Sequence, residues 1–120
     1  MEYQVKLFKM GDQKYRGYIV IKLNYNGLKI HWTLSDCGCY PSSKWIELLN
    51  FINFNAITDT SPIVGGGENS TWTADVTDLN FRLCFDISGG GGDSEIIYEF
   101  PIDKMIPVIE QIIEKIKEME

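Results

Sequence analysis

The sequence predicts an α+β fold, an antiparallel meander sheet in the element order βββα–βββα with two helices packed on one face. Segments of alternating apolar and polar residues, separated by short turn sequences, predict strands that follow one another as antiparallel neighbours. Two other segments place apolar residues at helical spacing. The long crossovers that parallel strands need are missing. With 120 residues, 44% of them hydrophobic, we expect a single domain over 1–120 with its own core.

The first meander is predicted over residues 3–10, 15–25 and 28–34. Each segment alternates apolar and polar residues, as a strand with one buried face does. Asn26-Gly27 separates the second segment from the third, and this pair tolerates the positive φ angles of a two-residue hairpin turn. The residues expected to share the buried face are Tyr3, Val5, Leu7, Ile19, Ile21, Leu23, Leu28, Ile30, Trp32 and Leu34.

A helix is predicted over 43–53, after a loop at 35–42 and before a loop at 54–67 that contains Gly65-Gly66-Gly67. Ser42 or Ser43 suits its N-cap. One buried stripe follows from the i, i+3, i+4, i+7 spacing of its apolar residues. These are Trp45, Leu48, Leu49 and Ile52.

The second half is predicted as strands over 68–76, 79–87 and 95–100, with a glycine-rich loop at 88–94. A helix over 103–119 closes the chain, with Asp103 as its N-cap. Pro107 fits near the first turn, so Ile109 is expected to be the first well-helical residue. The three tryptophans lie on the apolar faces of their segments, which indicates core packing.

Charge is distributed unevenly along the chain. Residues 31–100 carry ten Asp or Glu and two bases, a net charge of −8, whereas residues 1–30 carry six bases and two acids. The whole chain has a formal net charge of −6. Such a surface attracts cationic partners and repels nucleic acid. The N-terminal residues contain no apolar signal region, and no apolar run is long enough to span a membrane, so we expect a cytoplasmic protein.

Topology predicts where the acidic loops gather. If strands 68–76 and 79–87 form a hairpin, residues 65–68 and 89–95 lie at the same end of the sheet, opposite the Thr77-Asp78 turn. The turn at Asp12 and the loop at Asp36 likewise share one end of the first meander. Loops held on a rigid sheet often bind partners. The residues expected to contact a partner are Asp36, Tyr40, Glu68, Asp93 and Glu95; the open sheet face with Lys22, His31 and Arg82 is the rival surface.

No residue pattern indicates a reaction, so no catalytic residue, metal ligand or cofactor is predicted. The glycine run 89–92 lacks the lysine of a phosphate-binding loop, and Asp93 and Glu95 would repel phosphate. His31 with Cys37, Cys39 and Cys84 lacks the usual spacing of a zinc site. An odd number of cysteines also argues against a disulfide-built secreted scaffold.

In general character the chain resembles small immunity proteins of bacterial polymorphic-toxin and contact-dependent inhibition systems. The shared features are an acidic single domain, an α+β meander, scattered tryptophans such as Trp45 and Trp72, and no catalytic signature. The resemblance implies a cytosolic protein with a cognate toxin partner and no enzymatic activity. We expect a monomer or weak homodimer that neutralises a basic, nuclease-like toxin by stoichiometric binding and occlusion. The alternatives are a phage-encoded inhibitor of a host defence nuclease, a small Cys/His metal-dependent enzyme or regulator, and a structural subunit that pairs through the strand at 3–10.

Overall fold

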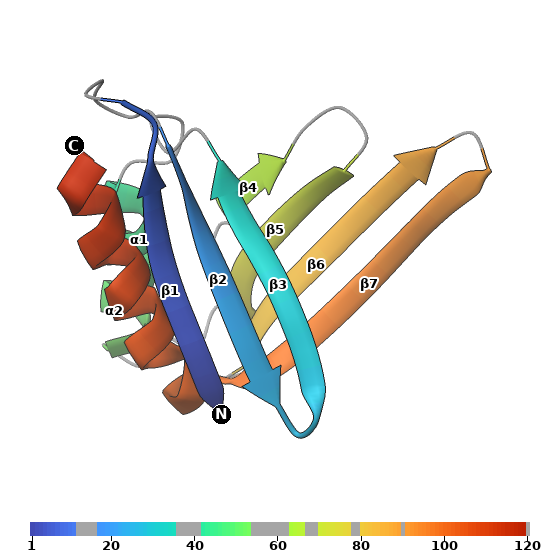
Figure 1. Ribbon diagram of the computed structural model, residues 1–120. Helices are drawn as coiled ribbons and strands as arrows, with labels where there is room; N and C mark the ends of the chain where they lie inside the picture. Colours follow the sequence, from blue (N-terminus) through green and yellow to red (C-terminus); the bar gives the residue numbers. More distant parts are fainter. Residues whose placement is uncertain are drawn as a thin grey trace.

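The strands of the protein form two antiparallel sheets in the computed structural model, which describes residues 1–11, 17–35, 42–53, 63–66, 70–77, 80–89 and 91–119. The elements follow the order βββα ββββα (Figure 1). Their bounds are β1 (Glu2–Lys9), β2 (Gly17–Tyr25), β3 (Leu28–Ser35), α1 (Ser42–Asn53), β4 (Ile63–Gly66), β5 (Ser70–Thr77), β6 (Asn80–Gly89), β7 (Gly92–Pro101) and α2 (Ile102–Met119). The predicted α+β class is therefore confirmed, with its strands divided between a first sheet (β1-β2-β3) and a second sheet (β4-β5-β6-β7).

The turn between β2 and β3 is the predicted Asn-Gly turn. Asn26 has φ 51° and Gly27 has φ 82°, the pair of positive angles that a type I′ turn requires. Tyr25 pairs with Leu28 directly across this turn. The register that follows buries Ile30 and Trp32 against the core. Two residues expected on the buried face are exposed: Leu28 by 43%, because it flanks the turn at the end of the hairpin, and Tyr3 by 42%, because it lies near the end of the edge strand β1.

Both helices lie on the same side of the molecule, as expected (Figure 1). Three residues of the predicted α1 stripe, Trp45, Leu48 and Ile52, are buried, and Leu49 is partly buried. Helix α2 contacts α1, strands β1 and β2 of the first sheet, and strands β6 and β7 of the second. It thereby holds the two sheets together through an apolar face. The buried residues of that face are Met105, Val108, Ile109, Ile112, Ile113, Ile116 and Met119.

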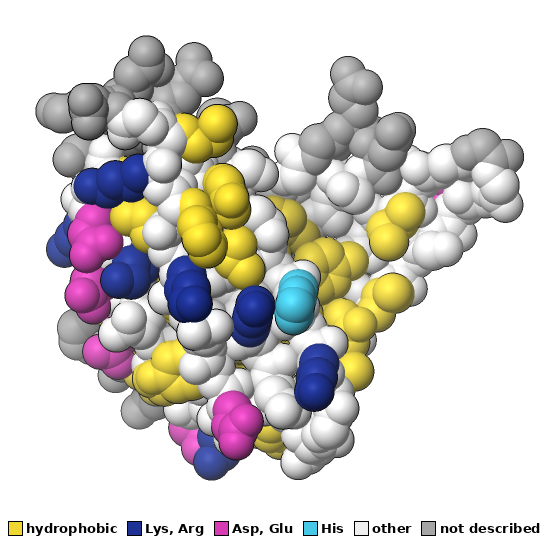
Figure 2. Space-filling view, in the orientation of Figure 1, with side chains coloured by type: hydrophobic (Ala, Val, Ile, Leu, Met, Phe, Trp, Pro, Cys, Tyr) yellow, Lys and Arg dark blue, Asp and Glu magenta, His cyan; other side chains and the backbone are white. Residues whose placement is uncertain are grey.

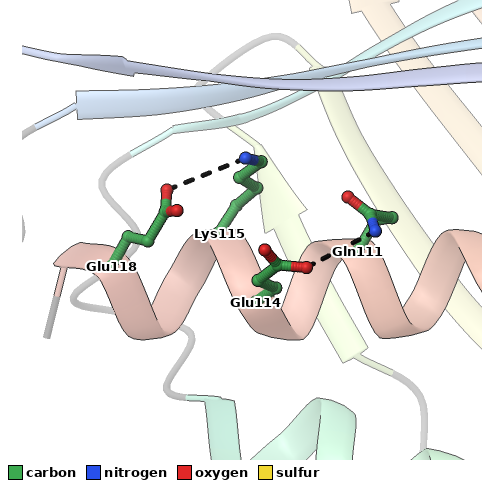
Figure 3. Close-up of polar contacts among 4 residues, drawn as sticks. All are labelled: Gln111, Glu114, Lys115 and Glu118. Carbon is green, nitrogen blue, oxygen red and sulfur yellow. Dashed lines mark hydrogen bonds and ion pairs between the residues drawn. The ribbon is translucent and has the colours of Figure 1, made fainter.

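The opposite face of α2 carries polar residues. Gln111 Nε2 donates to Glu114 Oε2 at 3.4 Å, and Lys115 Nζ lies 3.8 Å from Glu118 Oε2 (Figure 3). Such exposed pairs stabilise a helix by only about 0.2–0.5 kcal/mol each. The stability of α2 therefore depends mainly on its buried face.

The three tryptophans meet where the two sheets and α1 come together. The ring centroid of Trp32 on β3 lies 5.9 Å from that of Trp45 on α1 and 5.0 Å from that of Trp72 on β5. All three side chains are buried, so the prediction of core packing is confirmed. The indole N–H groups of Trp32 and Trp45 have no hydrogen-bond partner among the described residues.

The loop predicted over 54–67 is wrong at its C-terminal end, because residues 63–66 form β4, which pairs with β5. Gly65 stands opposite Trp72 in that pair. A Cβ atom at Gly65 would overlap the indole ring of Trp72. This glycine is thus required by packing inside a strand, whereas the sequence alone indicated a flexible loop.

The glycine-rich loop predicted over 88–94 is also wrong. Strands β6 and β7 continue through the pairs Ser88–Asp93 and Gly89–Gly92, which leaves a turn of only two residues. Residues 80–101 therefore form one long hairpin, here called the β6–β7 hairpin. Its outer end projects beyond the helices (Figure 1).

Helix α2 begins earlier than expected. Its first residue is Ile102, so Asp103 lies in the first turn and Pro107 lies inside the helix. Pro107 has no N–H to donate to the carbonyl of Asp103. The complete burial of Met105 and Val108 on either side of the proline favours the helical conformation in spite of this lost hydrogen bond.

Candidate protein-binding site

A groove separates strand β3 from the inner face of the second sheet. The space-filling view shows the molecule hollowed between its main body and the projecting hairpin, with apolar side chains inside the recess (Figure 2). The groove has a volume of about 660 Å³, within the range of roughly 300–1,000 Å³ typical of ligand pockets. One wall is β3 from Lys29 to Ser35, and the other is formed by β5, β6 and β7.

The wall formed by the β6–β7 hairpin is apolar. Phe85 pairs with Ile96, and Tyr98 lies one pair further along the same face. The rings of Phe85 and Tyr98 are 6.0 Å apart in an edge-to-face arrangement. Towards the tip the face is open, since Ile87 is 48% and Ile96 42% exposed. Contiguous exposed apolar side chains of this kind mark interaction surfaces.

The wall formed by β3 is a sheet edge with which no strand among the described residues pairs. Residues flanking a two-residue hairpin turn exchange two backbone hydrogen bonds, and such pairs alternate with unbonded pairs along the ladder. Counting from Tyr25–Leu28, the even-numbered residues of β3 bond to β2. The odd-numbered residues direct their N–H and C=O groups towards the groove: Lys29, His31, Thr33 and Ser35.

The outer face of the β6–β7 hairpin is acidic. Asp86 pairs with Glu95, and Asp93 follows at the next outward position of β7. These three carboxylates surround a second recess, here called the acidic hollow, of about 380 Å³. Ile87 and four hydroxyl groups complete its lining; the hydroxyls belong to Ser70, Thr71, Ser88 and Ser94. The hollow thus offers negative charge and hydrogen-bond acceptors together.

Cys84 lies at the inner end of this acidic face. Its thiol donates to Asp86 Oδ2 at 3.9 Å. Burial, followed by the charges of Asp86 and Glu95, raises the pKa of the Cys84 thiol, so the thiol is protonated at neutral pH. One ligand atom from each of these three residues lies within 4.8 Å of the others. A protonated thiol beside two carboxylates forms hydrogen bonds readily, whereas a metal ion requires the thiolate.

Basic residues collect on the outer face of the first sheet. The register places Lys22 between Gln4 and His31, with Lys6 and Lys29 in the neighbouring rows. Figure 2 shows Lys or Arg side chains and the histidine gathered across the front of the molecule. Charges of opposite sign therefore lie on different surfaces: the outer face of the first sheet is basic, and the outer face of the β6–β7 hairpin is acidic.

The structure brings together two of the five residues predicted to contact a partner. Asp93 and Glu95 are exposed and line the acidic hollow. The β4–β5 and β6–β7 connections lie at the same end of the second sheet, as expected. The remaining predicted residues, Asp36, Tyr40 and Glu68, lie outside the described residues.

Asp86 was missed as a site residue. Its signal was present in the sequence, because pairing β6 with β7 through a two-residue turn puts Asp86 opposite Glu95. The rival surface does not form as one patch. Lys22 and His31 are neighbours on the first sheet, but Arg82 lies on the second sheet, paired with Asp75 and Glu99.

The cysteine and histidine residues considered for zinc are not gathered within the described part of the chain. His31 is exposed on β3, whereas Cys84 is buried on the second sheet. Cys37 and Cys39 lie outside the described residues. No helix in the described ranges is long and apolar enough to cross a membrane.

Comparison with known proteins supports the fold alone. No protein-family model and no curated protein matches the chain. One similar solved structure is that of Trypanosoma brucei MRP1/MRP2, with a TM-score of 0.52 and 8% sequence identity. The match covers 97% of this chain and 83% of that one. The arrangement of two sheets and two helices is therefore shared with a protein of very different sequence.

Proposed function

We propose that this protein is a stoichiometric binding protein without enzymatic activity, and that its acidic hollow receives basic side chains of a protein partner. The observation that carries the proposal is the convergence of Asp86, Asp93 and Glu95 from two paired strands on one solvent-open recess. A lysine or arginine side chain complements such a recess. Arginine fits it best, because its planar guanidinium donates to two carboxylate oxygens at once.

Electrostatic attraction would make association fast. A cluster of like charges on a rigid hairpin raises the local concentration of a basic partner and steers its approach, with effects of roughly 10–1,000-fold on association rates. The same carboxylates compete with the phosphates that a basic nuclease binds. Occlusion of a basic cleft is therefore a physical route to inhibition.

This chemistry agrees with the immunity-protein hypothesis, in which a cytoplasmic protein neutralises a cognate basic toxin. A phage-encoded inhibitor of a host nuclease would use the same acidic hollow and is distinguished by the identity of the partner. The partner is to be isolated by affinity purification from a native lysate and identified by mass spectrometry. Its association rate with this protein then provides the quantitative test.

The test compares two double variants with the same change in net charge. Asp93→Lys/Glu95→Lys reverses the charge of two residues that line the hollow. Glu110→Lys/Glu114→Lys reverses the charge of two exposed residues on α2. We expect the first variant to lower the association rate at least about 10-fold at low salt and to flatten its salt dependence. The second should have a small effect. Equal losses in both variants, or turnover of a substrate by the protein, would contradict the proposal.

A further inference from the structure

The groove has two features that together define the chemistry of its occupant. Its β3 wall offers unpaired backbone donors and acceptors over seven residues, Lys29 to Ser35. Its other wall offers exposed apolar side chains, among them Phe85 and Ile96. An extended strand satisfies both, because its backbone pairs with β3 and alternate side chains pack on the apolar wall.

Charge adds a third requirement. The odd-numbered side chains of β3 lie on the outer face of the first sheet, where Lys29 and His31 join the basic surface of Lys6 and Lys22. A strand added to β3 places every second side chain on that same face. The best occupant is therefore a strand that alternates acidic residues on its outer face with apolar residues facing the groove.

Strand β7 of this chain has that alternation except at Ser94, which faces inward, and Ile97, which faces outward. Its outward-facing residues include Asp93, Glu95 and Glu99, and its inward-facing residues include Ile96 and Tyr98. We propose that a second copy of this chain binds the groove, with its β7 paired to β3 of the first copy.

The free edge of β7 supports this pairing. Gly89 and Gly92 flank the two-residue turn of the hairpin, so alternation of the ladder leaves the odd-numbered residues of β7 with backbone groups directed away from β6. This edge runs from Asp93 to Glu99. It is seven residues long, as is the free edge of β3.

One antiparallel register places an acidic residue of β7 opposite a lysine of β3. With Lys29 opposite Glu99 of the second copy, Thr33 and Ser35 stand opposite Glu95 and Asp93. Two carboxylates of the hollow then adjoin hydroxyl groups rather than lysines. The groove and the acidic hollow share Ser70, Thr71 and Ile87 in their linings, but the carboxylates belong to the hollow alone. The test of the dimer needs no basic partner.

If each copy places its hairpin in the groove of the other, the assembly stops at two copies. Each copy has one groove and one hairpin, so two copies that exchange hairpins leave neither groove open and form a two-fold dimer. Ile87 and Ile96, which line the groove, and both strand edges become covered, which removes features that otherwise promote uncontrolled strand pairing.

Adjacent isoleucines of β7 provide a matched test. Ile96 is 42% exposed and faces the groove, whereas Ile97 is 43% exposed and lies on the outer face. We expect size-exclusion chromatography with light scattering to give a mass that rises towards twice the monomer mass of 13.7 kDa as the concentration increases from about 1 to about 200 μM, as a micromolar dissociation constant requires. Ile96→Asp should abolish the dimer, whereas Ile97→Asp should retain it, with circular dichroism confirming that both variants fold.

A charge exchange provides a second test at exposed positions. Lys29→Glu and Glu99→Lys should each raise the dimer dissociation constant at least about 10-fold, and the double variant should restore it, since opposite charges face each other again. A monomeric wild-type protein over the whole concentration range, or an Ile96→Asp variant that is folded and dimeric, would overturn the proposal. A monomeric wild type that loses a different protein partner on Ile96→Asp would assign the groove to that partner instead.

Discussion

Replacing Gly65 with alanine should destabilise the protein strongly, although the change adds one methyl group. The methyl carbon would overlap three atoms of the Trp72 indole ring. Trp72 is 5% exposed and packs against Trp32 and Trp45 at centroid distances of 5.0 and 6.4 Å. Displacing the ring would disturb its packing on these two buried tryptophans, so the strain spreads into the core.

The magnitude follows from measured costs of overpacking. Adding a methyl group to a packed core costs about 1–3 kcal/mol. For a chain of this length, 1 kcal/mol corresponds to roughly 4 °C in Tm. We therefore expect Gly65→Ala to lower the Tm by about 4–12 °C.

Gly91→Ala is the matched control. A Cβ atom at Gly91 meets no atom within 4 Å, and the φ angle of Gly91 is not positive. This substitution should change stability by no more than about 1 kcal/mol, and in the stabilising direction if the unfolded chain loses entropy. Thermal unfolding followed by far-UV circular dichroism measures both. Equal Tm values for Gly65→Ala and wild type would refute the packing of β4 on Trp72 described above.

Two further predictions concern the second sheet and α2. Cys84 should react slowly with iodoacetamide at neutral pH, because burial and the neighbouring carboxylates raise the pKa of its thiol. Asp86→Asn should accelerate that reaction near pH 9, whereas Asp93→Asn should not, as peptide mass spectrometry can measure. Above pH 9.0, the ordinary pKa of the thiol, Cys84 ionises in the unfolded chain but keeps its proton in the native protein. The contribution of Cys84 to stability is therefore complete below pH 9.0 and falls as the pH rises above it. Pro107→Ala should raise the free energy of unfolding by about 1 kcal/mol or more, because it restores a donor to the carbonyl of Asp103; an unchanged midpoint in urea would show that the helix loses nothing at the proline.

The sequence predicts most elements because local chemistry determines them. Asn26-Gly27 requires a tight turn whatever surrounds it, and this turn sets the register of β2 and β3. The stripe of α1 and the alternation in β6 each identify a buried face without knowledge of the neighbouring elements. Such elements can be predicted from residues that are close together in the sequence.

The missed features depend on contacts between distant residues. Gly65 resembles a loop residue until Trp72 is placed against it, and the glycines near the hairpin tip resemble a loop until Ser88 pairs with Asp93. The division into two sheets, and hence the groove between β3 and Phe85, depends on how the whole chain packs. Asp93 and Glu95 could be predicted as neighbours, whereas Asp86 joins them only through strand register.

The tryptophan fluorescence of the protein comes from one cluster of side chains. All three tryptophans of the chain belong to the cluster, and they come from β3, α1 and β5. Excitation energy passes readily between indoles at such short separations, so their emission reports collectively on the junction between the two sheets. Any ligand that opens or closes the angle between the sheets should change the intensity or the anisotropy of that emission, with no extrinsic label required.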